Sequence, residues 1–232
     1  IAFPFKVDGG IVRLDLGWGF IRPDADQIAG ACKDFIAVQN AADVSSAKAG
    51  VTWVSLDAPL VEVGTMTDET LIEKGGRGWK TQAGPSQTIY SYAMNNYWHT
   101  NYRADQEGPV LLRYSVRPHA EFNGAAVVKF GIERARPLLV ARAEENRQVV
   151  PSLFKVSPPE AVVTSLRPAS DRNGWVVRLF NPSATRLDAV LAAGDGSPLA
   201  VFRSDPFEVK LARSAGTIRL DARDSVALRV ER

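Results

Sequence analysis

The sequence predicts a mainly all-β protein: a large antiparallel β-sandwich with one short helix, followed by a small terminal β-sandwich. Three observations lead to this fold class. Apolar and polar residues alternate in many short stretches, turn-forming residues separate those stretches, and few stretches carry a helical spacing. Alternation is typical of a strand with one buried face, and many short strands joined by tight turns favour a sandwich over a parallel sheet.

The alternating stretches recur along the whole chain. In the first of them Val12, Leu14 and Leu16 share one face of a predicted strand, while Arg13 and Asp15 share the other. The further predicted strands are residues 51–56, 111–116, 175–180, 207–211, 217–220 and 225–230. Turns are expected at 8–10, 75–78, 173–174 and 194–198, where glycine, asparagine and proline supply tight-turn geometry.

Two stretches have a helical spacing of apolar residues. Residues 121–134 are rich in alanine, and Phe122, Ala126 and Phe130 recur every four residues, which predicts a short helix. Residues 24–39 follow a proline and have a similar spacing, so we weigh a second helix there, although Gly30 interrupts it.

A domain boundary is expected near residue 155, where three prolines follow a charged stretch at 142–147. We therefore predict a large β-sandwich region over residues 1–155 and a small C-terminal β-sandwich over residues 156–232. The chain shows no internal repeat and no low-complexity tract.

Composition excludes several classes of protein. The 232 residues are 45% hydrophobic and 23% charged, which is typical of a globular protein, and the net charge of +2 gives no electrostatic reason to bind nucleic acid. Cys32 has no cysteine partner, and with His99 and His119 it falls short of a structural zinc pattern. No apolar run is long enough to span a membrane, so no membrane partner is expected.

Two further expectations concern the start of the chain and its compartment. Because the sequence begins at Ile1 in mid-pattern, we expect it to come from a longer polypeptide. The single cysteine and the absence of a glycosylation sequon are compatible with a bacterial cytoplasm or periplasm, so the localisation is left open.

Common catalytic motifs are not found. The glycines at 75–78 lack phosphate-loop spacing, and the sequence has no Gly-x-Ser-x-Gly elbow. Paired carboxylates for glycoside hydrolysis cannot be chosen by spacing, and most acidic residues are solvated or capping groups. The candidates of this kind are Asp57, Glu62, Asp105 and Glu107.

One segment, residues 90–102, combines tyrosines, asparagines, a tryptophan and a histidine. Flat aromatic faces next to amide and imidazole groups suit a surface that contacts sugars. The alternative is structural, because aromatic residues on a strand also fill cores and asparagines also form turns, and composition alone favours that alternative.

These residues also carry a resemblance to a known family. The run from Met94 to Tyr102, with Gln106–Gly108 and Leu112–Ser115, resembles the carboxyl-terminal β region of bacterial glycoside hydrolase family 38 enzymes, which are retaining α-mannosidases. Further stretches resemble that region in the same order: Phe3–Phe5, Val12–Asp15, Phe35–Gln39, Gly50–Trp53, Leu56–Gly64 and Arg178–Asn181.

The resemblance implies a part of a galactose-mutarotase-like supersandwich that packs on an amino-terminal α/β barrel and lends residues to the rim of its sugar pocket. In such a parent enzyme the barrel carries the zinc ion, held by two histidines and two aspartates, and hydrolyses α-mannosides with retention through two carboxyl groups. This chain has only His99 and His119 and cannot supply that set, so we expect it to be inactive alone and to have no cofactor of its own.

The predicted site residues, which contact either the sugar or the other domain, are Asn95, Asn96, Trp98, His99, Asn101, Asp57 and Pro59. The predicted partners are the catalytic barrel of the same parent chain and an α-mannoside or related glycan. The alternatives are a stand-alone carbohydrate-binding β-sandwich and a structural adhesion module. An accessory region separated from its partner is expected to expose a large apolar patch, whereas an independent lectin is not.

Overall fold

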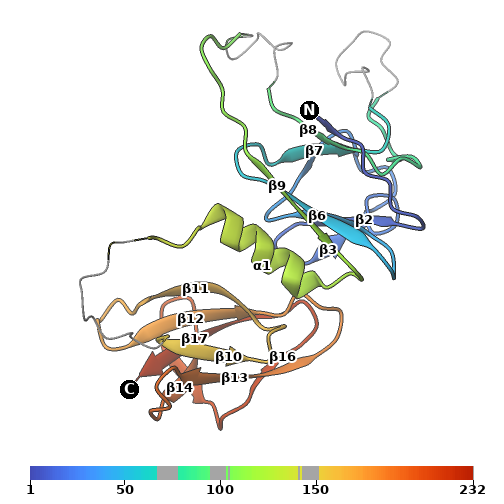
Figure 1. Cartoon of the computed structure of the whole chain (residues 1–232). Coiled ribbons are helices and arrows are strands. Elements are labelled where there is room, and N and C mark those ends of the chain that lie inside the picture. Colours follow the sequence, from blue (N-terminus) through green and yellow to red (C-terminus); the bar gives the residue numbers. More distant parts are fainter. Residues whose placement is uncertain (67–77, 95–102, 104, 141, 143–151, 232) are drawn as a thin grey trace. The chain divides into compact units, whose positions relative to one another are not determined.

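The structure is a computed structural model that describes residues 1–66, 78–94, 103, 105–140, 142 and 152–231 (Figure 1). These residues form many antiparallel strands and one α-helix, so the predicted mainly all-β class is confirmed. The chain divides into two compact units: Ile1–Asn123 with Phe130–Pro137, and Gly124–Lys129 with Leu138–Arg232. The helix in the described part of the chain is too short and too polar to cross a membrane.

The first unit is built from two antiparallel sheets, which Figure 1 shows as separate layers. One is 4-stranded, in the order β1-β8-β7-β4, and the other is 5-stranded, in the order β3-β2-β5-β6-β9. The strands of the first sheet are β1 Ala2–Phe3, β8 Ile89–Ser91, β7 Leu60–Val63 and β4 Ile36–Ala37. Those of the second are β3 Phe20–Ile21, β2 Ile11–Asp15, β5 Ala42–Ser45, β6 Gly50–Ser55 and β9 Tyr114–His119.

The core of the first unit is centred on Trp53, which is fully buried. Its ring packs edge-on against Phe3 at 5.3 Å between centroids and stacks on Tyr114 at 5.7 Å. Apolar residues from both sheets complete this core, among them Leu14, Val44, Val61, Val63 and Ile89. Burial of this apolar surface is the main force that holds the two sheets together.

The opposite face of the 5-stranded sheet carries a polar row. Arg13, Asp43, Thr52 and Arg117 are cross-strand partners on β2, β5, β6 and β9. The Arg13 guanidinium lies 4.4 Å from the centroid of the Phe122 ring, and the Arg117 guanidinium lies 4.5 Å from that of Phe130. Phe122 and Phe130 thus cover the two arginine side chains of this face through cation–π contacts.

The second unit pairs a 3-stranded sheet, β10-β13-β16, with a 5-stranded sheet, β11-β12-β17-β14-β15. The strands are β10 Phe154–Ser157, β13 Leu187–Ala193, β16 Ile218–Leu220, β11 Val162–Pro168, β12 Trp175–Phe180, β17 Ser225–Glu231, β14 Ala200–Ser204 and β15 Lys210–Arg213. Leu179, Leu220, Leu228 and Val230 are fully buried between the sheets. This is a small sandwich, as the sequence predicts.

The helix α1, Gly124–Ala135, confirms the helix predicted at 121–134. It begins after Asn123, a residue type that favours the N-cap position, and it has Arg134 in its last turn, where a cation stabilises the helix dipole. Val127 and Val128 are 1% exposed. Pro137 follows the last turn and is consistent with its end there.

The prediction of a second helix at residues 24–39 is wrong. The only regular element in this segment is the short strand β4. Gly30 adopts φ +78°, which breaks a helix, and the Asp24 carboxylate accepts a hydrogen bond from the Ala83 backbone N at 2.6 Å. An acidic side chain thus bonds a distant backbone group instead of capping a local helix.

Two predicted strands are shifted along the chain. The strand expected at 111–116 is β9, which starts at Tyr114. The strand expected at 207–211 is β15, which starts at Lys210, because the Asp205 carboxylate accepts hydrogen bonds from the backbone N atoms of Phe207 and Val209 and holds them in a turn. The other predicted strands agree with β2, β6, β12, β16 and β17 within one residue at either end.

Candidate functional site

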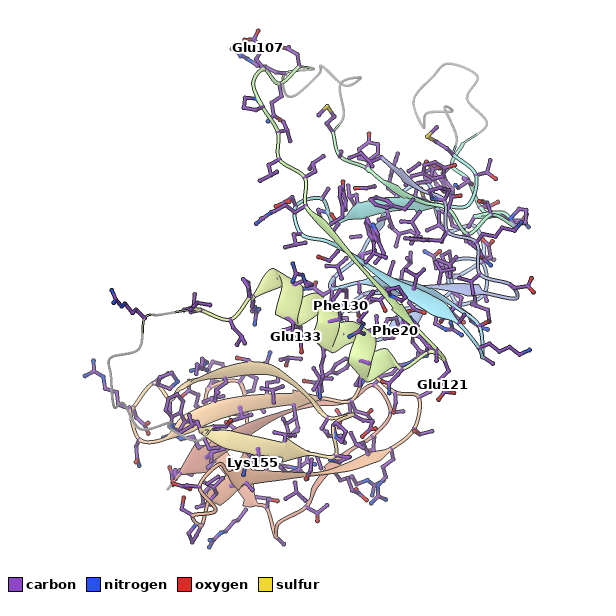
Figure 2. All side chains as sticks on the ribbon, in the orientation of Figure 1. Phe20, Glu107, Glu121, Phe130, Glu133 and Lys155 are labelled. Carbon is purple, nitrogen blue, oxygen red and sulfur yellow. The ribbon has the colours of Figure 1, made fainter. Side chains whose placement is uncertain are left out.

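Most of the predicted site lies outside the described residues. Asn95, Asn96, Trp98, His99 and Asn101 belong to this group, so their placement stays a prediction. The structure does describe where the chain leaves the sheet before them and where it returns. Figure 2 shows Glu107, on the returning stretch, far from both sheets of the first unit.

The stretch that leaves the sheet after β8, Tyr92–Met94, is held against the start of β7. The Tyr92 backbone N donates to the Leu60 carbonyl at 3.0 Å, and the Tyr92 ring packs on Phe35 with centroids 4.7 Å apart. Two residues later the Met94 side chain is 50% exposed. The chain therefore leaves the sheet next to the turn that contains Asp57 and Pro59.

Asp57 bonds the returning stretch at Arg113. The Arg113 backbone N and Nε donate to Asp57 Oδ2 at 2.7 and 3.1 Å, and Arg113 Nη2 donates to Oδ1 at 2.7 Å. The Leu56 backbone N also donates to the Arg113 carbonyl at 3.0 Å. This bidentate pair ties the turn after β6 to the residue before β9, and so fixes the base of the intervening stretch.

Electrostatics keep this pair charged. The hydrogen bonds from the Arg113 side chain and backbone lower the pKa of the Asp57 carboxyl, and the same carboxylate raises the pKa of the Arg113 guanidinium. Asp57 is therefore a positioning carboxylate with its oxygens already engaged. This arrangement supports a structural role for Asp57 and gives it none of the features of a general acid.

Pro59 shapes the same turn. The Ala58 backbone N donates to Ser55 Oγ at 3.1 Å, and the Pro59 carbonyl accepts from the Val38 backbone N at 2.8 Å. Proline fixes its own φ, so the chain enters β7 in a defined direction. Asp57 and Pro59 therefore lie together at the base of the stretch that carries the remaining predicted site residues.

A buried polar cluster around His119 was not predicted as a site. His119 Nε2 lies 2.7 Å from Asp43 Oδ2, and Nδ1 lies 3.2 Å from the Glu121 carbonyl. Asp43 is fully buried and also accepts from the hydroxyls of Ser45 and Thr52. The sequence signal for this cluster is the two-residue spacing of Asp43 and Ser45, which places both polar side chains on one face of a strand. Every oxygen of Asp43 already has a donor, so the cluster is built for structure.

Gly50 makes room for this cluster. A Cβ at Gly50 would lie 2.4 Å from His119 Cε1 and 2.5 Å from Ser45 Cβ, closer than real contacts allow. The glycine is thus required by the approach of the imidazole ring to β6.

Metal binding finds no support in the residues that the structure describes. They contain no group of three or more His, Cys, Asp or Glu side chains that could hold a metal ion. The zinc that the family resemblance implies is expected in the catalytic barrel, so its binding stays a prediction.

Two open clefts lie side by side on the first unit. Residues 4–9 and 85–88 line one of about 730 Å³, and residues 10–12, 22–25, 63 and 83–87 line one of about 300 Å³. Asp57 and Pro59 line neither of them. Gln87, which both clefts share, is engaged by the backbone of Val7 and Gly10 at 2.7 to 2.9 Å.

Comparison with solved structures finds the same fold in glycoside hydrolases. An α-mannosidase from Enterococcus faecalis V583 matches 98% of this chain and 25% of its own, with 16% identity and a TM-score of 0.61. A protein of glycosyl hydrolase family 38 from Enterococcus faecalis matches 98% of this chain and 26% of its own, with 16% identity and a TM-score of 0.66. No family model and no curated protein matches the sequence.

This chain has the fold of one part of an α-mannosidase chain and of one part of a glycosyl hydrolase family 38 chain. The predicted resemblance is thereby confirmed at the level of the fold. The chain spans about a quarter of the length of these two chains. At 16% identity the match shows the shared fold, and it leaves the residues that contact a sugar as predictions.

Proposed function

We propose that this chain is a non-catalytic β region of an α-mannosidase-like glycoside hydrolase, which packs on a catalytic barrel of the same polypeptide and shapes the rim of its sugar pocket. The observation that carries the proposal is the unequal coverage: 98% of this chain corresponds to 25% or 26% of the two enzyme chains. The remaining three quarters leave room for a separate catalytic domain.

The site geometry agrees with this role. The Asp57–Arg113 pair and the Pro59 turn hold the base of the stretch that contains Asn95, Asn96, Trp98, His99 and Asn101. In the proposed enzyme these amide, indole and imidazole groups contact sugar hydroxyls or the neighbouring domain at the pocket rim. The two carboxyl groups of the retaining reaction and the zinc ligands belong to the barrel, and this chain alone is inactive.

The size of the natural polypeptide tests the proposal. An antibody against this chain should detect a protein about four times the 25.2 kDa of these residues, since the matched share is close to a quarter. That protein should copurify with zinc and with α-mannosidase activity. A natural protein of 25.2 kDa would contradict the proposal and favour a stand-alone carbohydrate-binding module.

Trp98→Ala in the natural full-length protein tests the pocket rim. If Trp98 lines the pocket, kcat/KM for an α-mannoside falls while the thermal stability stays unchanged. If Trp98 fills a core, the stability of this region falls by about 3 to 5 kcal/mol. Trp18→Ala is a matched control, because Trp18 is 76% exposed in the turn after β2.

A further inference from the structure

The 4-stranded sheet of the first unit has an unusual outer face. Cross-strand pairing places Ala2, Tyr90 and Glu62 in one row and Leu60 beside Ala37 in the next, while the alternate residues of the same strands point into the core. Phe35 and Tyr92 continue the outer positions just beyond β4 and β8. We call this set the aromatic face: Ala2, Phe35, Ala37, Leu60, Glu62, Tyr90 and Tyr92.

The residue types of the aromatic face are those of an interface. An antiparallel sheet that faces water on one side has polar residues on that side. Here Phe35 is 44% exposed and Leu60 is 37% exposed, while Tyr90 and Tyr92 are half-buried. Aromatic residues are enriched and charged residues are depleted at the centre of protein interfaces.

The carboxylate on the aromatic face is already neutralised. Glu62 is 6% exposed, and its Oε1 lies 2.8 Å from Lys80 Nζ. The same ammonium donates to the carbonyls of Val63 and Thr65 at 3.1 and 2.7 Å. A partner that covers this face therefore does not bury an unpaired charge at Glu62.

The other sheet of the same unit shows the contrast. Its outer face carries the polar row, and Phe122 and Phe130 cover Arg13 and Arg117 of that row. Within the described residues, the first unit thus shields a polar sheet face and exposes an apolar one.

We propose that the aromatic face is the surface on which the catalytic domain of the parent polypeptide docks. This inference rests on the proposed function and adds to it the surface that makes the contact. The two chains of the same fold are about four times as long as this chain, so the parent polypeptide of the proposed function includes a partner of sufficient size.

A glycan fits the aromatic face less well. The Phe35 and Tyr92 rings are tilted by 57° to each other, so they do not form one flat platform for a sugar ring. The Glu62 carboxylate, which could accept from sugar hydroxyls, is committed to Lys80. The exposed side chains of Phe35 and Leu60 suit a protein surface of matching shape.

Hydroxyl-radical footprinting of the natural full-length protein tests the inference. The readout is the oxidation rate of Phe35 and Tyr92 relative to the same residues after unfolding in urea. An open face with Phe35 44% exposed predicts a rate lowered by about twofold. A docked face predicts a rate lowered by at least about tenfold, because interface centres are nearly fully buried.

Leu60→Arg in the same protein adds a second measurement. Docking predicts that this charge loosens the contact and raises the Phe35 oxidation rate at least threefold toward the open value. The matched control is Leu211→Arg, which places the same charge on the exposed strand β15 and should leave the Phe35 rate unchanged. If the Leu60 variant fails to fold, the oxidation rate of Phe35 in the unsubstituted protein still tests whether the aromatic face is covered.

The outcomes separate this inference from the proposed function. A full-length protein about four times the mass of this chain with Phe35 at the open rate overturns the docking surface and leaves the proposed function standing. A natural protein of 25.2 kDa overturns both. Protection that requires added α-mannoside, or that disappears on dilution, identifies a glycan or a second copy as the occupant and overturns the inference.

Discussion

The indole of Trp53 gives the sharpest test of the core of the first unit. Trp53→Ala removes a fully buried side chain that packs on Phe3 and Tyr114. Replacing a buried tryptophan by alanine costs about 3 to 5 kcal/mol of unfolding free energy, from lost burial and from the cavity left behind.

Trp53→Phe should behave very differently. Among the described residues the buried Trp53 Nε1 has no hydrogen-bond partner, and an unmet buried donor costs about 1 to 3 kcal/mol. Phenylalanine removes that donor and gives up only part of the ring, which costs about 1 to 3 kcal/mol from lost burial and the smaller cavity left behind. The two effects nearly cancel, so the unfolding free energy should change by less than about 1 kcal/mol.

Urea unfolding followed by circular dichroism measures both variants in this chain. The matched controls are Trp18→Ala and Trp18→Phe, which should each stay within about 0.5 kcal/mol of the unsubstituted protein because Trp18 is 76% exposed. If Trp53→Phe loses as much stability as Trp53→Ala, then relief of the buried donor does not offset lost packing, and the reasoning is refuted.

Three further results are expected. Gly50→Ala should lower the unfolding free energy by about 1 to 3 kcal/mol, because its methyl group meets His119, and an unchanged urea midpoint would contradict this. Glu208 has its pKa lowered to about 2, chiefly by hydrogen bonds from Ser170, so its contribution to stability is present above the ordinary glutamate pKa and is lost as the pH falls toward 2. Glu208→Gln should therefore flatten the fall of Tm between pH 5 and about 2, whereas an equally steep fall would show that Glu208 does not contribute. Asp57→Asn should raise the proteolysis rate of the stretch before Arg113 at neutral pH, because it weakens the Asp57–Arg113 pair that holds this stretch. A rate equal to that of the unsubstituted protein would show that the pair does not hold the stretch.

Long strands of this fold could be predicted from the sequence, whereas the shortest ones could not. β17 runs for 7 residues with a large apolar residue at every second position, and β12 runs for 6 residues of which all but Arg178 are apolar, so both strands could be predicted from sequence. The strands β1 and β4 have 2 residues each, which is too short for alternation to show. Their place is set by pairing with β8 and β7, a tertiary effect that no local pattern carries.

The candidate site was predictable to a smaller degree. Proline and aspartate at 57–59 indicate a turn, and the turn is present. The partner of Asp57 is Arg113, which lies 56 residues away, and no spacing rule connects the two. The polar cluster at His119 is also assembled across strands, from residues 76 positions apart in the case of Asp43 and His119.

The polar row of the 5-stranded sheet has a consequence for how the strands find their pairing. A slip of one residue between β5 and its neighbours would turn Asp43 toward the core and move Val44 out of it. Burying the Asp43 charge among apolar side chains without its Ser45, Thr52 and His119 partners is far costlier than losing one apolar contact. The row therefore penalises misregistered pairing of β5 with β2 and β6.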